Sequence, residues 1–231
     1  MSGIFSEVAN KYFESGYNVI PLEPGTKKPF IPAWQQWCEV RQAAFTVEQW
    51  CYSYANHNIG IPLGNISNII AIDFDYEGEG TQAEVIKLLP NMPVKKKGRK
   101  GFTAFFRYNG ESPKKWYKDG KSIVELLSTG NQTVMPPSIH PDTQQPYIWT
   151  TPDTLIDILA EDLPILPENF IEKVDAIFGY EKRLPRYNHY EGELPELKEV
   201  EKALSFIPSD EYATWITVGM ALHHAYNVAG S

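Results

Sequence analysis

The stretch NIIAIDFDYE, residues 68–77, decides the fold, because an apolar run in it ends on two closely spaced acids. Residues 69–72 are apolar and mostly β-branched, which is typical of a buried strand. Asp73 and Asp75 then occupy alternate positions of that strand. Side chains alternate faces along a strand, so both carboxylates point the same way, with Cα atoms roughly 7 Å apart. The stretch therefore predicts a buried sheet that presents a pair of acids at the end of one strand.

Short segments with strand character lie on both sides of residues 68–77, and helical patterns flank them. Apolar residues bounded by Gly, Pro or Asn predict strands at 17–22, 58–64, 101–108, 122–128, 132–138 and 147–150. Helical periodicity predicts helices at 4–15, at 46–55 with Thr46 as N-cap, and at 81–89, 155–163 and 168–179. Strands in the middle with helices on either side favour an α+β, or mixed α/β, fold.

The charge of the chain is unevenly distributed. The formal net charge of the 231 residues is −8, which by itself argues against a nucleic-acid-binding protein. Between residues 95 and 121, however, ten basic residues are accompanied by only two acidic ones, so this window carries +8 and the rest of the chain −16. Such a distribution is typical of a protein that binds phosphates at one place and repels them elsewhere.

Glu125 supplies a third acid in the apolar run 123–127. A charge at such a position is costly unless it is paired or bound to a metal ion. Neighbouring carboxylates also repel one another unless a cation lies between them, and Mg²⁺ or Mn²⁺ binds carboxylate oxygens while leaving positions for phosphate. We therefore predict Asp73, Asp75 and Glu125 as metal ligands and catalytic residues. The alternatives are solvent-facing acids at a strand end, and an outward residue on an edge strand for Glu125.

Residues 95–100 form a basic segment that leads into the strand predicted at 101–108. Gly98 and Gly101 let backbone N–H groups approach a phosphate, and the basic side chains add charge. The predicted phosphate-binding residues are Lys97, Arg99 and Lys100, and the predicted DNA-binding residues are Lys95, Lys96, Arg107, Lys114 and Lys115. A solvated surface loop is the alternative interpretation of the segment.

The segment PPSIH, residues 136–140, predicts a rigid turn, because proline fixes φ. Such a turn presents Ser138 and His140 on one side, and we expect both to contact the nucleotide; a purely structural histidine is the alternative. The sequence contains no Walker loop, dinucleotide-binding fingerprint or nucleophile elbow. Cys38 and Cys51 show no metal-ligand spacing.

About residues 5–165 resemble the bifunctional primase-polymerase domain of the archaeo-eukaryotic primase superfamily, in the form found in phage and plasmid replication proteins. The motifs that carry the resemblance are GYNVIPL, KKP, NIGIPLG, AIDFD, KKGRKGFTAFFRY, IVELLSTGNQTVMPPSIHP and YIW. Residues 196–231, with the run WITVGMAL, are similar to the beginning of a primase C-terminal helical domain.

This resemblance implies a two-module core with an RRM-like antiparallel or mixed sheet, an active site between the modules, and a helical C-terminal fragment. It implies DNA-templated transfer of nucleotides from dNTPs or NTPs to a 3′-hydroxyl, with Mg²⁺ or Mn²⁺ as cofactor. Asp73 and Asp75 match the family's first acidic motif, and Glu125 falls where its third acid, usually Asp, is expected. Thr103 stands near the position of the family's histidine and is assigned to the nucleotide site.

We expect a catalytic domain at 1–178, a linker at 179–195, and the first part of a longer helical domain at 196–231. The expected partners are a single-stranded or primed DNA template and a helicase domain in the longer protein. No membrane association is expected, since no apolar run approaches ~18 residues; the expected location is the cytoplasm of a bacterial host or phage-infected cell. Two other functions stay open: a DNA-binding replication module with little or no synthesis, and a metal-dependent nuclease.

Overall fold

The computed structural model describes residues 3–75, 80–180, 196–206 and 218. The chain divides into two compact units, residues 1–181 and 182–231, and each is described by itself. The described part of the second unit includes helix α5 (Leu197–Leu204), whereas most of the predicted linker and helical region lies outside the described residues. In the part of the chain that the structure describes, no helix is long and apolar enough to cross a membrane.

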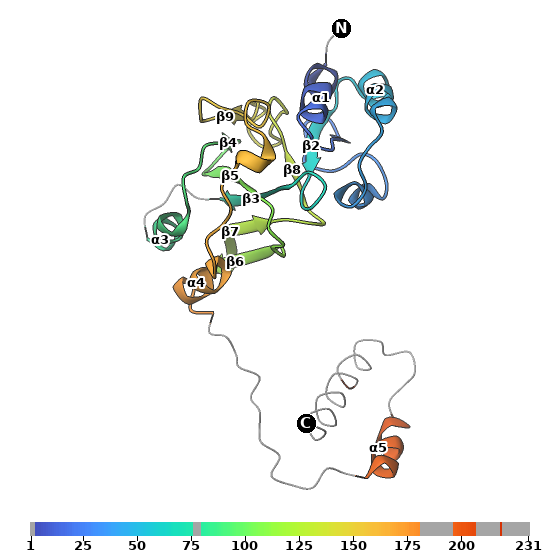
Figure 1. The fold of residues 1–231 in the computed structure, drawn as a ribbon, viewed down its shortest axis with the longest axis vertical. Coiled ribbons are helices and arrows are strands. Elements are labelled where there is room, and N and C mark those ends of the chain that lie inside the picture. Colours follow the sequence, from blue (N-terminus) through green and yellow to red (C-terminus); the bar gives the residue numbers. More distant parts are fainter. Residues whose placement is uncertain (1–2, 76–79, 181–195, 207–217, 219–231) are drawn as a thin grey trace. The chain divides into compact units, whose positions relative to one another are not determined.

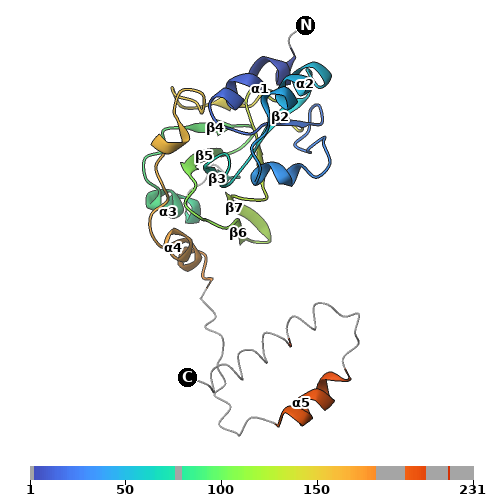
Figure 2. The ribbon, with the colours of Figure 1, turned by 45° about the vertical axis from the view of Figure 1, so that its right-hand side comes forward.

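A six-stranded antiparallel sheet forms the centre of the first unit (Figures 1 and 2). Its strand order is β6-β7-β3-β5-β4-β9. The strands are β3 (Ile69–Phe74), β4 (Lys95–Lys97), β5 (Phe102–Arg107), β6 (Lys114–Lys118), β7 (Lys121–Leu127) and β9 (Ile148–Trp149). β3 contains the two acids and pairs with β5 on one side and β7 on the other, so it lies in the interior of the sheet.

A smaller antiparallel sheet and two helices form the other half of this unit. The sheet has the order β1-β2-β8, with β1 (Ile20–Leu22), β2 (Asn58–Pro62) and β8 (Gln132–Val134). Helices α1 (Ile4–Glu14) and α2 (Ala44–Ser53) contact each other, and α1 also packs on β2. Phe5, Ala9 and Tyr12 recur at helical spacing on α1 and are buried, as expected for a helix that covers a core.

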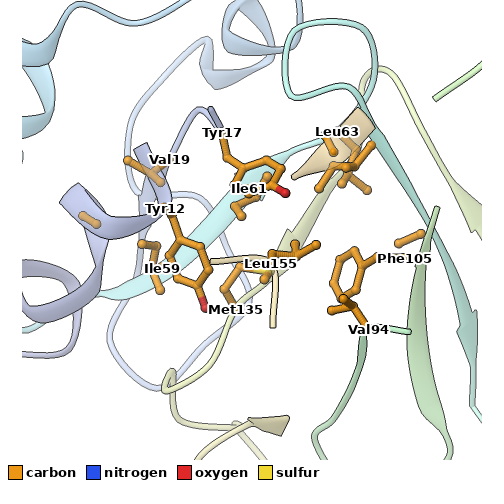
Figure 3. Packing of buried hydrophobic residues seen from close by; sticks show 14 of the residues in the cluster. Tyr12, Tyr17, Val19, Ile59, Ile61, Leu63, Val94, Phe105, Met135 and Leu155 are labelled. Atoms are coloured by element: carbon orange, nitrogen blue, oxygen red, sulfur yellow. The ribbon is translucent and has the colours of Figure 1, made fainter. Parts of the chain in front are cut away.

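The main hydrophobic core joins the two sheets (Figure 3). Ile59 and Ile61 of β2 and Tyr12 of α1 pack in one cluster with Phe105 of β5 and the nearby Val94. All five side chains are essentially inaccessible to solvent. Because this cluster contains residues of both sheets, it fixes the position of one sheet relative to the other.

The two faces of β3 have different surroundings. Its even-numbered side chains belong to a second hydrophobic cluster, which also contains residues of α3 (Thr81–Leu88) and α4 (Phe170–Ile177). Its odd-numbered side chains belong to the main core as far as Ala71, and Asp73 is the next residue on that face. One face of the strand therefore changes from core to polar surface within two residues.

The predicted α+β fold is confirmed by the two antiparallel sheets and the helices that cover them. One helix prediction was wrong, since residues 155–163 are not helical apart from the 3-10 turn η2 (Ala160–Asp162). Leu155 and Leu163 are buried there, but Leu159 is 55 % exposed. Burial of this segment therefore does not follow the helical period that its apolar residues suggest.

Two local predictions need correction as well. Helix α2 begins at Ala44 with Ala43 as its N-cap, so Thr46 lies within the first turn and does not cap the helix. The basic segment predicted as a loop begins as strand β4, in which Lys96 is buried between two less buried lysines. A run of lysines contains no apolar residue that would mark this alternation in the sequence.

Strand β6 is an element that the sequence analysis missed. It forms a hairpin with β7 through the two residues Asp119 and Gly120, whose φ angles are 51° and 75°. Two-residue hairpin turns of this kind require positive φ, and an Asp-Gly pair supplies it at low cost. The pair was therefore a usable sequence signal for the hairpin.

Asn58, the first residue of β2, links two loops that are far apart in the sequence. Its buried amide donates to the carbonyl oxygens of Thr26 and Ile139, each at 2.9 Å, and accepts the N–H of Ile139 at 2.9 Å. Because unpaired buried groups cost about 1–3 kcal/mol each, we expect Asn58→Ala to lower the free energy of unfolding by about 2–4 kcal/mol in urea denaturation. Asn91→Ala, at an exposed loop position, should change it by less than about 0.5 kcal/mol. Equal effects of the two substitutions would contradict this role.

Candidate active site

Five polar side chains form a row across the six-stranded sheet, which we call the polar row. Its members in spatial order are Lys96 of β4, Thr103 of β5, Asp73 of β3, Glu125 of β7 and Lys115 of β6, each opposite the next in the strand register. Directly opposed residues of antiparallel strands lie on the same face, with Cβ atoms about 4.5–5.5 Å apart. The two acids therefore lie side by side in the row, with a cation at each end.

Four members of the polar row, all except Lys115, line a cavity of about 1160 Å³. The cavity also contacts Thr133 and Val134 of β8, so both sheets contribute to it. Its charged lining residues are Lys27, Asp73, Asp75, Lys96, Arg99, Lys100, Lys118, Asp119, Lys121, Glu125 and Asp142. The volume suits a ligand at least as large as a nucleotide. The three predicted acids thus share one cavity with basic residues from three separate segments.

Asp73 is a half-buried carboxylate held by its neighbours in the sheet. The hydroxyl of Thr103 donates a hydrogen bond of 2.5 Å to its Oδ1. Burial raises the pKa of Asp73 above its usual value, while the positive charge of Lys96 and the Thr103 hydrogen bond act in the opposite direction. Thr103 therefore binds the acid directly in this structure.

Lys96 is buried although it carries an ammonium group. Its Nζ donates to the carbonyl oxygen of Val134 at 2.6 Å and lies 5.1 Å from the ring centre of Tyr147 and 6.0 Å from that of Phe105. Burial lowers the pKa of Lys96 to about 8, and the negative charge of Asp73 limits this decrease. Lys96 is therefore predominantly positive at neutral pH.

Asp75 is exposed, whereas Glu125 is half-buried like Asp73. Glu125 forms an ion pair of 2.9 Å with Lys115, whose side chain is 52 % exposed, and this hydrogen bond raises the pKa of Lys115. Asp75 follows the end of β3 and is exposed. Among the described residues, no group of three or more His, Cys, Asp or Glu side chains forms a ready metal-binding cluster as placed. Glu125 would have to leave Lys115 to join Asp73 and Asp75 at an ion.

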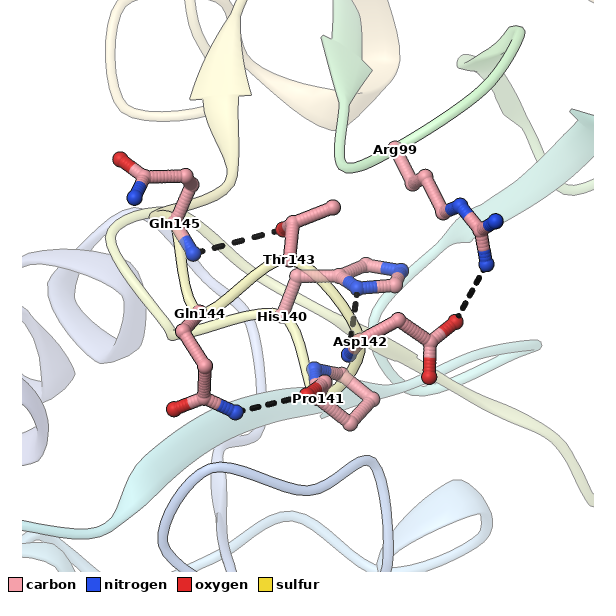
Figure 4. A network of polar contacts seen from close by, with 7 residues as sticks. All are labelled: Arg99, His140, Pro141, Asp142, Thr143, Gln144 and Gln145. Carbon is pink, nitrogen blue, oxygen red and sulfur yellow. Dashed lines mark hydrogen bonds and ion pairs between the residues drawn. The ribbon is translucent and has the colours of Figure 1, made fainter.

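His140 lies in the cavity wall beside the basic segment (Figure 4). Its Nδ1 accepts the N–H of Asp142 at 3.2 Å, which places the proton of the neutral ring on Nε2. Asp142 also forms an ion pair of 2.9 Å with Arg99. A Cβ atom at Gly98 would lie 2.9 Å from the His140 ring and 2.4 Å from that of Tyr147. Gly98 therefore allows the basic segment to approach this wall.

Several predicted site residues lie outside the cavity lining. Ser138 is buried, and its hydroxyl accepts the N–H of Ile59 at 2.8 Å, so it holds β2 in place. Arg107 donates to the carbonyl oxygen of Glu161, and Lys114 pairs with Asp175 of α4 at 2.6 Å. The remaining predicted residues outside the lining are Lys95, Lys97 and Lys115.

Three basic residues of the cavity were missed by the sequence analysis. Lys27 belongs to the KKP motif, which was noted only as part of the family resemblance. Lys118 and Lys121 flank the Asp119–Gly120 turn, so recognising that hairpin would have placed both lysines at one tip. The proximity of Lys27 to Asp73 depends on the packing of two sheets and has no local signal in the sequence.

The burial of His140 predicts a pH dependence of stability. Burial, the first cause, lowers its pKa below the usual 6.5, so the unfolded chain takes up a proton at higher pH than the folded one. Stability should therefore decrease as the pH falls below about 6.5. His140→Asn, whose Oδ1 can still accept the Asp142 N–H, should reduce the difference in Tm between pH 7.5 and pH 5.5. His57, whose pKa burial also lowers, accounts for part of the remaining difference. The same difference in both proteins would refute the assignment.

Comparison with protein families agrees with this geometry. Residues 9–169 match the model of the family described as bifunctional DNA primase/polymerase, N-terminal, and residues 200–231 match the model described as primase C terminal 2. A comparison with curated proteins found no match. The first match covers more than half of the chain and includes the whole polar row. The chain therefore belongs to the bifunctional DNA primase/polymerase family, which has a role in DNA replication and implies DNA and nucleotides as substrates.

Proposed function

We propose that this domain transfers nucleotides from dNTPs or NTPs to the 3′-hydroxyl of a strand paired with a DNA template. The observation that carries the proposal is the alignment of Asp73 and Glu125 on neighbouring strands, facing a cavity that basic residues also line. Acids alone would repel a triphosphate, and lysines alone would bind it without catalysis. Both kinds of residue are needed for a reaction in which a hydroxyl attacks a phosphate and pyrophosphate leaves.

The donor set of the cavity fits divalent ions. Asp73, Asp75 and Glu125 offer only oxygen ligands, the kind that Mg²⁺ and Mn²⁺ prefer. The partial burial of Asp73 near the negative charge of Asp75 is a second sign, because a bound cation would relieve the repulsion between them. When bound, such ions would lower the pKa of the attacking hydroxyl and neutralise charge on the leaving group. Asp73 and Asp75 would hold them first, and Glu125 would join after leaving Lys115.

The basic residues of the cavity divide into two groups by position. Lys27 and Arg99 interact electrostatically with His140, and Lys100 follows Arg99 in the same cavity lining. We assign these three to the triphosphate, with the Nε2–H of His140 as a neutral donor. Lys118 and Lys121 lie at the tip of the β6–β7 hairpin, and we assign them to the DNA backbone. Thr103 contributes to the proposed nucleotide site indirectly, because its hydroxyl orients the Asp73 carboxylate.

The proposal also covers the domain organisation of the chain. We infer a catalytic domain at 1–178, a linker at 179–195 and the first part of a helical domain from 196 onward, in a replication protein of phage or plasmid type. The match of residues 200–231 to a primase C-terminal family supports this division. A helicase domain in the longer protein would supply the unwound template.

Removing both acids of β3 tests the catalytic assignment. We expect Asp73→Ala combined with Asp75→Ala to reduce nucleotide incorporation to background in a primer-extension assay with Mg²⁺ or Mn²⁺, because the ion loses its main ligands. Circular dichroism should show an intact fold. Asp162→Ala removes an exposed acid of η2 outside the cavity and should leave incorporation unchanged. Retained synthesis by the double variant would remove the assignment.

The same assay separates the alternative functions. Wild-type protein incubated with labelled primed DNA and metal, but without nucleotides, should leave the DNA intact. Degradation would indicate a nuclease that uses these acids. DNA binding without incorporation when nucleotides are added would indicate a binding module, and either result would overturn the proposal.

The hairpin lysines test the path of the DNA. Lys118→Gln with Lys121→Gln should weaken binding of primed DNA at low salt and reduce the slope of log K against log[salt] by about 1–2, since each phosphate contact contributes about one unit. Lys28→Gln removes an exposed lysine outside the cavity and should leave the slope unchanged. An unchanged slope in the hairpin variant would exclude this path.

A further inference from the structure

Lys96 places a positive charge in the interior, next to the acid to which we assign a metal ion. It is opposite Thr103 in the register, and Thr103 is opposite Asp73, so Lys96 and Asp73 flank Thr103 on one face of the sheet and their charges act on each other. The hydrogen bond to Val134 and the rings of Tyr147 and Phe105 hold the ammonium in place. The charge is therefore fixed beside the acids and cannot swing into solvent as a surface lysine does.

This fixed charge has a consequence for metal binding. In the absence of an ion, Lys96 and Asp73 compensate each other. An ion bound to Asp73 would engage the carboxylate and would then lie close to a like charge, the Lys96 ammonium. Because Lys96 is buried, water only partly screens the repulsion between its ammonium and such an ion. Lys96 therefore opposes the binding of a divalent ion on its own.

A polyphosphate reverses this balance. Its negative charges would be attracted by the ion and by Lys96 together, and Lys27 and Arg99 line the same cavity. The ion then gains an anionic ligand, and the ammonium gains a counter-charge in place of the engaged carboxylate. The ion and the polyphosphate thus stabilise each other in the presence of Lys96 more than they would without it.

We propose that Lys96 is a positioning charge that makes the site bind a divalent ion and a nucleoside triphosphate together, and that disfavours the ion alone. This rests on the proposed function, since it requires the metal site at Asp73, Asp75 and Glu125. Lys96 acts here through its fixed charge and not through transfer of a proton.

The test compares two neutral variants of Lys96 with a matched control. Lys96→Met keeps the length and apolar character of the side chain, and Lys96→Gln keeps a donor for the Val134 carbonyl. Lys28→Met removes a lysine that is 72 % exposed, pairs with Glu23 and lies outside the cavity. Calorimetry or Mn²⁺ paramagnetic resonance measures the affinity of each protein for Mn²⁺ alone. A second titration uses the preformed Mn²⁺ complex of a non-hydrolysable α,β-imido dNTP.

We expect the Lys96 variants to bind Mn²⁺ alone about tenfold more tightly than wild type, and the Mn²⁺–nucleotide complex about tenfold more weakly. The Lys28 variant should change neither affinity more than about twofold. Unchanged or weaker binding of Mn²⁺ alone by the folded Lys96 variants would overturn the inference. If wild type and the Asp73→Asn, Asp75→Asn double variant bind Mn²⁺ equally, the metal site itself is wrong, which is a different failure.

A further measurement keeps the inference testable if both Lys96 variants unfold. Asp73→Asn removes the counter-charge of Lys96 and should free its ammonium for an anion. Tripolyphosphate without metal should then bind this variant more tightly than it binds wild type or Asp75→Asn, because Asp73 is the carboxylate whose charge acts on Lys96. Equal tightening by the two substitutions would show that Lys96 has no special position.

Discussion

The partial burial of one carboxylate, Asp73, is the constraint on which the rest of the site depends. Withdrawing an ionised carboxylate even partly from water costs free energy unless donors and a cation lie beside it. Thr103 supplies the donor and Lys96 the charge, and both come to Asp73 through the antiparallel register of β4, β5 and β3. A slip of one residue would turn these side chains to opposite faces. The site therefore exists only in this register of the strands.

The acids lie on the six-stranded sheet, but the site also needs residues of the smaller sheet. The ammonium of Lys96 is held by the carbonyl of Val134 in the smaller sheet. Asn58, also in that sheet, fixes the residues next to Lys27 and His140, which lie on two different loops of the cavity wall. The core between the sheets thus positions the cations relative to the acids, so a loss of packing there would change the electrostatics of the site.

The features of the site that could be predicted from the sequence are those whose sequence pattern has few alternative interpretations. An apolar strand that ends on alternate acids, and a glutamate inside an apolar run, indicate acids that share one site, and the structure puts Asp73 and Glu125 opposite each other, both half-buried. The basic segments could not be resolved in this way, since a run of lysines has no apolar periodicity to show that Lys96 points inward. The helix predicted at residues 155–163 was wrong for a different reason. Its apolar pattern fits a helix, but it also fits an irregular segment packed against a core.

In the basic window, residues 95–121, the position of each basic residue matters more for phosphate binding than the number of basic residues. Lys114 and Lys115 are occupied by carboxylates of the protein, and Arg107 by a backbone carbonyl. Lys96 lies in the interior. Lys100 and the hairpin lysines Lys118 and Lys121 line the cavity around the acids, as does Arg99, which is paired with Asp142. A phosphate entering the cavity meets carboxylates as well as cations, so its binding depends on neutralisation of those carboxylates. An acidic protein can in this way handle nucleic acid at one place without attracting it elsewhere.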